Sequence, residues 1–218
     1  MDPRRSTGRH RTPRSAAKIL KRFSWRKRKS LQEEGHLAQA EKLQRQTLEI
    51  QRRVEGPEAT NTLSATIDMA TTVRKQGRYS EAEKLERTAL EAMRRVLGPE
   101  HPMTLSSRDE LAQTLGKEGR YDEAEKLERP TLDAMRRVLG PEHPDTASAA
   151  YDLSIILADA GRSDEAISVL RDAIDHGLNP VTDRAMATDP DLKPLHKDPH
   201  FAELVSHAEQ RAAATEPH

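Results

Sequence analysis

Glycine recurs along this chain every 42 residues, and this period constrains the fold more than any other feature of the sequence. Two series follow it, one at Gly35, Gly77, Gly119 and Gly161 and the other at Gly56, Gly98 and Gly140. Residues 77–102 and 119–144 are identical at 22 of 26 positions. A fixed period of this length is typical of a protein built from stacked copies of one supersecondary unit.

Each period contains two amphipathic segments. In residues 79–97 the apolar positions are spaced three or four residues apart, which predicts one stripe along a helix. They are Ala82, Leu85, Ala89, Met93 and Val96. Residues 103–118 form the second segment, which Gly119 ends. An isolated helix pair cannot bury its stripes, so we expect an all-α fold, an α-solenoid of about 3.5 helix-turn-helix repeats with C-terminal capping helices.

The pentapeptide Gly-Pro-Glu-His-Pro joins the two segments at residues 98–102 and again at 140–144. A glutamate beside a histidine suggests catalysis, but catalysis would need a third group within about 3 Å, and the sequence supplies none. The structural interpretation is that glycine ends one helix, proline blocks its continuation, and His-Pro sets an extended approach to the next helix. The copy at 56–60 has Ala59 and Thr60 instead of His-Pro, so we expect it to be the loosest of the three joints.

Residues 77–102 resemble the 42-residue tetratricopeptide repeats of kinesin light chains, through Gly-Arg-Tyr, Glu-Ala-Glu-x-Leu and Leu-Gly-Pro-Glu-His-Pro. The resemblance covers residues 31–176 and implies small residues at fixed positions of both helices. These are Ala70, Ala112 and Ser154 in first helices, and Ala40, Ala82, Ala124 and Ala166 in second helices. Residues 189–205 are similar to the segment that closes such arrays in bacterial serine/threonine kinases, although the kinase motifs themselves do not occur in this chain.

These patterns divide the chain into a basic N-terminal arm (1–30), a repeat array (31–176) and a C-terminal helical cap and tail (177–218). A helix over residues 16–34 is one interpretation of the arm. In the cap we expect two or three short helices, broken at Pro190, Pro194 and Pro199. Pro130 falls midway along an expected helix, where it should cost about 3 kcal/mol or kink the helix.

The chain departs from the kinesin-light-chain pattern at the positions that would line a concave groove. The family's paired asparagines are replaced by Ile67-Asp68, Asp109-Glu110 and Tyr151-Asp152, so the second position is acidic in every copy. Carboxylates suit a basic or amine-bearing partner. The candidate partner-binding residues are Asp68, Arg108, Asp109, Glu110, Tyr151 and Asp152.

A non-catalytic scaffold that binds a protein or peptide is therefore the leading hypothesis. An enzyme is the rival, but no phosphate loop, hydrolase elbow or metal motif is present in the sequence. A third alternative is a truncated remnant of a larger signalling protein.

The basic arm carries 12 lysines and arginines against one acid, while residues 31–218 carry 24 against 35. Its cluster comprises Lys21, Arg22, Trp25, Arg26, Lys27, Arg28 and Lys29. Three interpretations stay open: nucleic-acid binding, a solvated arm without a dedicated partner, and docking on the acidic remainder.

Composition excludes several other classes. There is no cysteine, hence no disulfide and no thiolate metal site. No apolar stretch reaches the length of a membrane span, so we expect a soluble, cytoplasmic protein without cofactor or metal. A metal site at His196, His200 and His207 is the alternative to the last expectation, and Pro199 argues against it because it interrupts the helix that would align the first two.

Overall fold

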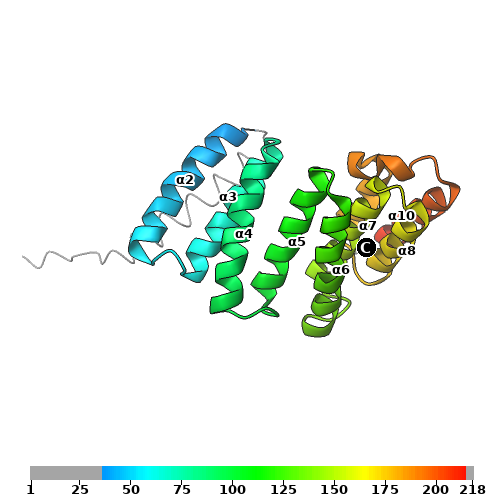
Figure 1. Cartoon of the computed structure of the whole chain (residues 1–218). Coiled ribbons are helices and arrows are strands. Elements are labelled where there is room, and N and C mark those ends of the chain that lie inside the picture. Colours follow the sequence, from blue (N-terminus) through cyan, green and yellow to red (C-terminus); the bar gives the residue numbers. More distant parts are fainter. Residues whose placement is uncertain (1–35, 215–218) are drawn as a thin grey trace, which may run out of the picture. The chain divides into compact units, whose positions relative to one another are not determined.

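The computed structural model describes residues 36–214, apart from the side chains of Pro180, Val181 and Arg184. The predicted helix over 16–34 and the basic arm lie outside these residues. Helices make up all the regular secondary structure of the described part, which confirms the all-α prediction (Figure 1). The described residues divide into two compact units, 36–77 and 78–214.

The described part of the first unit is one helix pair, α2 (Leu37–Val54) and α3 (Thr60–Lys75), whose helices pack against each other. In the second unit α4 (Tyr79–Val96), α5 (Pro102–Lys117), α6 (Tyr121–Val138), α7 (Pro144–Asp159) and α8 (Ser163–Asp175) pack in chain order. Helix α5 also packs directly against α7, so first helices of consecutive repeats are neighbours. This is the helix-turn-helix stacking that the 42-residue period predicts.

All seven small residues implied by the family resemblance have no exposed surface. They are Ala40, Ala70, Ala82, Ala112, Ala124, Ser154 and Ala166. Their short side chains let neighbouring helices approach closely, because a longer side chain in a close-packed interior would force displacement. This part of the resemblance is confirmed residue by residue.

The Gly-Pro-Glu-His-Pro segments are joints, as predicted, and their histidines also cap helices. Gly98 and Gly140 have φ of +97° and +96°, a left-handed conformation that favours glycine. His101 and His143 are extended, and each accepts a hydrogen bond on Nδ1 from the backbone N–H two residues later, at 3.2 Å. Ala59 has the same extended backbone but no capping side chain. That its joint is the loosest stays a prediction.

The predicted apolar stripe is only partly correct. In α4, Ala82, Ala89 and Met93 are buried, but Val96 is 46% exposed, and the fully buried Glu86 lies among them. Pro130 does not end its helix. It lies inside α6, which is 18 residues long, the same length as α4.

The C-terminal prolines mark helix starts more than breaks. Helix α9 (Pro180–Ala185) is followed by the 3₁₀ helices η1 (Met186–Thr188) and η2 (Pro190–Leu195), and then by α10 (Pro199–Ala214). Pro194 lies inside η2. Proline suits the first turn of a helix because its missing N–H would be unpaired there. Leu192, Leu195, Phe201 and Leu204 join the core formed by α7 and α8, so the segment covers the end of the array.

Candidate functional site

A group of polar side chains from α5, α6 and α7 meets at the contact between the first helices of consecutive repeats. We name it the α5–α7 polar cluster: Arg108, Asp109, Gln113, Glu128 and Asp152. The Gln113 Nε2 amide donates to Asp109 Oδ2 at 3.1 Å and to Asp152 Oδ2 at 2.8 Å. One amide therefore joins two carboxylates that belong to consecutive repeats.

Glu128 lies at the buried side of this cluster and has no exposed surface. Within the described residues, neither of its carboxyl oxygens accepts a hydrogen bond from an N–H or O–H donor. A buried ionised carboxylate without donors is strongly disfavoured. Burial first, and then the charges of Asp109 and Asp152, raise the pKa of Glu128 well above its ordinary value. The protonated form of Glu128 is therefore favoured.

Arg108 is the cation of the cluster. Its side chain is partly buried, and Nη2 donates to the backbone oxygen of Leu127 at 3.5 Å. Burial lowers the pKa of Arg108, while the neighbouring Glu128 raises it and Arg94 lowers it. Its charge opposes the rise in the pKa of Glu128, but it gives that carboxyl no hydrogen bond.

The repeat shows why Glu128 lacks a donor. One period earlier, the buried Glu86 accepts a hydrogen bond from Thr114 Oγ1 at 2.9 Å. The residue 42 positions after Thr114 is Ile156, which is buried and has no hydroxyl. The third repeat has therefore kept the buried acid and lost the group that satisfied its equivalent.

This position was not predicted from the sequence. Glu86 and Glu128 follow Ala82 and Ala124 by four residues, which places them on the buried face of the helix. The signal was the column formed by Gln44, Glu86, Glu128 and Leu170, which is polar in three repeats and apolar in the last.

The structure brings together three of the six predicted partner-binding residues: Arg108, Asp109 and Asp152. Glu110 follows Asp109 on α5 and is partly exposed. Asp68 is exposed on α3 in the first unit. Tyr151 is buried, and its hydroxyl donates to Asp189 Oδ2 at 2.5 Å, so it attaches the C-terminal segment. We leave Tyr151 out of the candidate surface for this reason.

The predicted basic-arm residues, Lys21, Arg22, Trp25, Arg26, Lys27, Arg28 and Lys29, all lie outside the described part of the chain. The three histidines of the alternative metal site have separate neighbours. His196 stacks on Phe201 with 5.6 Å between ring centroids, His207 lies 3.0 Å from Asp175, and His200 lies 3.3 Å from Asp198. Among residues 36–214 no group of three or more histidines and acids is arranged to hold a metal ion.

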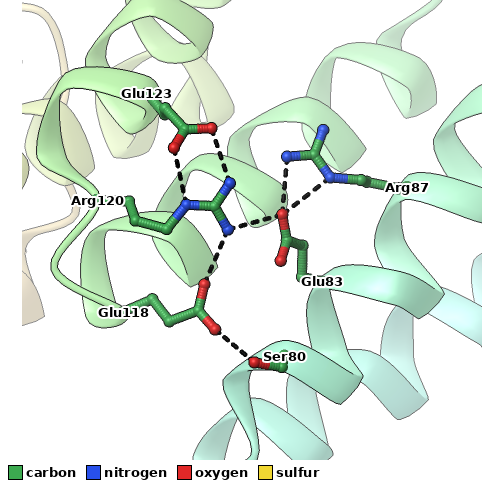
Figure 2. Close-up of polar contacts among 6 residues, drawn as sticks. All are labelled: Ser80, Glu83, Arg87, Glu118, Arg120 and Glu123. Carbon is green, nitrogen blue, oxygen red and sulfur yellow. Dashed lines mark hydrogen bonds and ion pairs between the residues drawn. The ribbon is translucent and has the colours of Figure 1, made fainter.

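A second polar group joins consecutive repeats near the Gly-Arg-Tyr turns, and we name it the inter-repeat arginine network (Figure 2). Arg120 Nη1 donates to Glu83 of the preceding repeat at 2.9 Å and to Glu118 at 3.0 Å, while Nη2 donates to Glu123 at 2.7 Å. Ser80 completes it by donating to Glu118 at 2.7 Å.

The contacts of Arg120 to Glu83 and Glu123 recur 42 residues later, whereas Ala160 replaces Glu118. Arg162 Nη1 donates to Glu125 of the preceding repeat at 2.5 Å, and Nη2 donates to Glu165 at 2.5 Å. These side chains are accessible to solvent, and exposed ion pairs contribute about 0–1 kcal/mol each. The network therefore aligns repeats, and the buried, unsatisfied Glu128 makes the α5–α7 polar cluster the stronger candidate for function.

The comparisons with known proteins agree with this architecture. The sequence matches the family model described as tetratricopeptide repeat over residues 29–95, 87–133 and 117–176. The chain belongs to the tetratricopeptide repeat family. Proteins of this family are generally protein–protein interaction scaffolds, typically without enzymatic activity.

Solved structures of kinesin-light-chain-like tetratricopeptide repeat proteins share the fold. Two structures of nearly identical TPR-like repeats from a putative kinesin light chain of Podosopora anserina each give a TM-score of 0.69. The form with a glutamine-to-methionine substitution is 21% identical over 89% of this chain and 95% of that one, and the other is 20% identical over 95% and 100%. BtubC (BKLC) from P. vanneervenii also gives 0.69, at 17% identity over 98% and 95%. No curated protein sequence matches the chain.

No helix within residues 36–214 combines the length and the apolar character needed to cross a bilayer.

Proposed function

We propose that this tetratricopeptide repeat protein is a non-catalytic scaffold that binds a basic protein segment through the first helices α5 and α7. The observation that carries the proposal is the Gln113 bridge. By donating to both Asp109 and Asp152, it holds carboxylates of consecutive repeats together at partly exposed positions. A partner peptide that runs along these helices would meet both carboxylates.

Charge supports a basic partner. Asp109, Glu110 and Asp152 are partly exposed acids of α5 and α7, and Arg108 precedes Asp109. Clustered carboxylates of this kind attract cations and disfavour acidic partners. Asp68 is the residue of the first unit that aligns with Glu110 and Asp152, and it is exposed. An acid at this position of each first helix agrees with a preference for basic partners.

A peptide-display selection tests the proposal. Random peptides of about 12 residues, long enough to cover an interface of a few side chains, are selected against the full chain. We expect the bound sequences to be enriched in lysine and arginine. Fluorescence anisotropy then compares the wild-type chain with the Asp109→Asn/Asp152→Asn variant. Loss of two charge-assisted contacts should weaken binding at least about a hundredfold, because each such contact contributes about 1.5–3 kcal/mol.

The chain offers a matched control for this measurement. Asp122 and Asp164 are also one period apart and both are exposed, but they lie on the second helices α6 and α8. Asp122→Asn/Asp164→Asn changes the net charge equally and should leave affinity nearly unchanged. Selected peptides without a basic bias, or equal weakening in both double variants, would contradict the proposal.

Three sequence-based hypotheses concern other parts of the protein and stay predictions. They are nucleic-acid binding by the basic arm, descent from the arrays of bacterial serine/threonine kinases, and a cytoplasmic location. A mobility-shift assay at low salt, with the chain and a variant lacking residues 1–29, tests the first, since arm-dependent binding should weaken steeply with salt.

A further inference from the structure

We infer that the α5–α7 polar cluster is a proton-exchange site, at which an ammonium or guanidinium group of the partner binds Asp109 and Asp152 while Glu128 gives up its proton to solvent. The inference rests on the proposed function and adds the chemistry of the contact. Because Glu128 loses its proton on binding, the affinity for a basic partner should rise with pH.

The first support is the placement of the three carboxyl groups. They come from three helices, Asp109 from α5, Glu128 from α6 and Asp152 from α7, and the amide of Gln113 ties two of them together. Asp109 and Asp152 are partly exposed and Glu128 is fully buried beside them. A cation arriving from solvent would therefore contact the two aspartates, with Glu128 behind them.

The second support is that Glu128 takes no hydrogen bond from any donor within the described residues, although it has no exposed surface. A buried ionised carboxylate without donors is strongly disfavoured. Protonation of Glu128 removes this cost while no partner is bound.

The charge balance follows from the groups that face Glu128. These are Arg108 and Asp109 on α5 and Asp152 on α7, with Arg94 of α4 acting on Arg108. A cation bound at Asp109 and Asp152 adds a positive charge near Glu128, which favours the ionised form of its carboxyl, so the proton leaves. One cation enters, one proton departs, and no covalent bond among heavy atoms changes.

The neighbouring repeat shows that this property is specific to one position. The carboxyl of Glu86 has the hydroxyl of Thr114 as its donor, whereas Ile156 occupies the equivalent position beside Glu128. Proton exchange is therefore expected at the third repeat, and Ile156→Thr should weaken it by supplying the missing donor.

Isothermal titration calorimetry with an octalysine peptide tests the inference. Titrations of the full chain at a pH of about 7 in phosphate and in Tris buffer should differ in apparent enthalpy, because protons released on binding are taken up by the buffer. Between about pH 5.5 and 8 we expect affinity to rise with pH, by at most about tenfold per pH unit for one exchanged proton. Glu128→Gln, which keeps the shape and cannot ionise, should bind with no buffer dependence from this group and with a flatter pH profile.

Two variants keep the test independent of folding defects. Glu128→Leu introduces the residue that the fourth repeat has at the equivalent position, Leu170, and should behave as Glu128→Gln does. Ile156→Thr should bind octalysine with reduced proton release.

Equal proton release from the wild-type chain and both Glu128 variants would overturn the inference, as would flat affinity in all three. If octalysine binds through the aspartates without proton exchange, the inference fails and the proposed function stands. If octalysine does not bind, the cation site is refuted, and the scaffold proposal is decided separately by the peptide selection.

Discussion

The joint at residues 56–60 can be converted into a copy of the other two. Ala59 has φ and ψ of −63° and 137°, and His101 has −65° and 138°, so the backbone already suits a capping histidine followed by proline. Thr60 is the first residue of α3, where the backbone N–H has no partner within the helix. We expect the double substitution Ala59→His/Thr60→Pro to stabilise this joint.

The magnitude follows from two contributions. The new Nδ1 acceptor would take one backbone N–H at about 3.2 Å, as in the other joints, and one such hydrogen bond contributes about 1 kcal/mol. Proline at a compatible position adds about 0.4–1 kcal/mol by restricting the unfolded chain. Together they should raise the local free energy of opening by about 1–2 kcal/mol, which is about a 5- to 30-fold change in the opening equilibrium.

Hydrogen exchange measured by mass spectrometry on a peptide spanning residues 56–66 reads this change directly. Thr60→Pro alone separates the proline contribution from the cap. The reverse exchange, His101→Ala/Pro102→Thr, should loosen the second joint by a similar factor. Unchanged or faster exchange in the double variant would show that the histidine cap is not what distinguishes the joints.

Three further outcomes are expected. Arg120→Ala removes contacts to Glu83, Glu118 and Glu123 and should lower the unfolding midpoint by a few degrees, with the loss reduced in high salt because these groups are accessible to solvent. Thermal melting of the variant in low and high salt checks it, and an equal loss at both would refute the electrostatic account. The pKa of Glu128 is raised in the folded state, so the stability linked to its protonation is full below its unfolded value and is lost as pH rises through the folded value. The free energy of unfolding of Glu128→Gln, measured with urea, should therefore fall less with rising pH than that of the wild type, and parallel profiles would contradict this. Tyr151→Phe removes the bond to Asp189 and should increase proteolysis within residues 186–198, whereas unchanged cleavage would mean that apolar packing alone holds this segment.

The period was enough to predict the helices, the joints and the buried small residues, because each is a local property repeated without change. Ala82 and Ala124 are placed correctly by comparison of one copy with the next. The role of Tyr151 was not accessible in this way. It aligns with candidate groove positions of earlier repeats, but the C-terminal segment, which has no counterpart in those repeats, covers it.

The buried acids were missed for a different physical reason. An apolar stripe assigns the buried face of a helix to apolar residues, so it does not identify Glu128 as buried. Its environment depends on contacts from α5 and α7, which are distant in sequence. Position 156 is isoleucine where the preceding repeat has Thr114. This difference matters only because Thr114 donates a hydrogen bond to Glu86, which the sequence alone does not show.

Because of the inter-repeat arginine network, the repeat that contains Glu83 and the repeat that contains Glu125 can replace each other. Glu83 and Glu125 have the same role, each receiving the arginine 37 residues further along, Arg120 and Arg162 respectively. An in-frame loss of residues 84–125 would bring Glu83 to the place of Glu125, opposite Arg162, with the local sequence almost unaltered. Loss or gain of a whole 42-residue unit can therefore change the length of the protein while the ion pairs between neighbouring repeats are preserved.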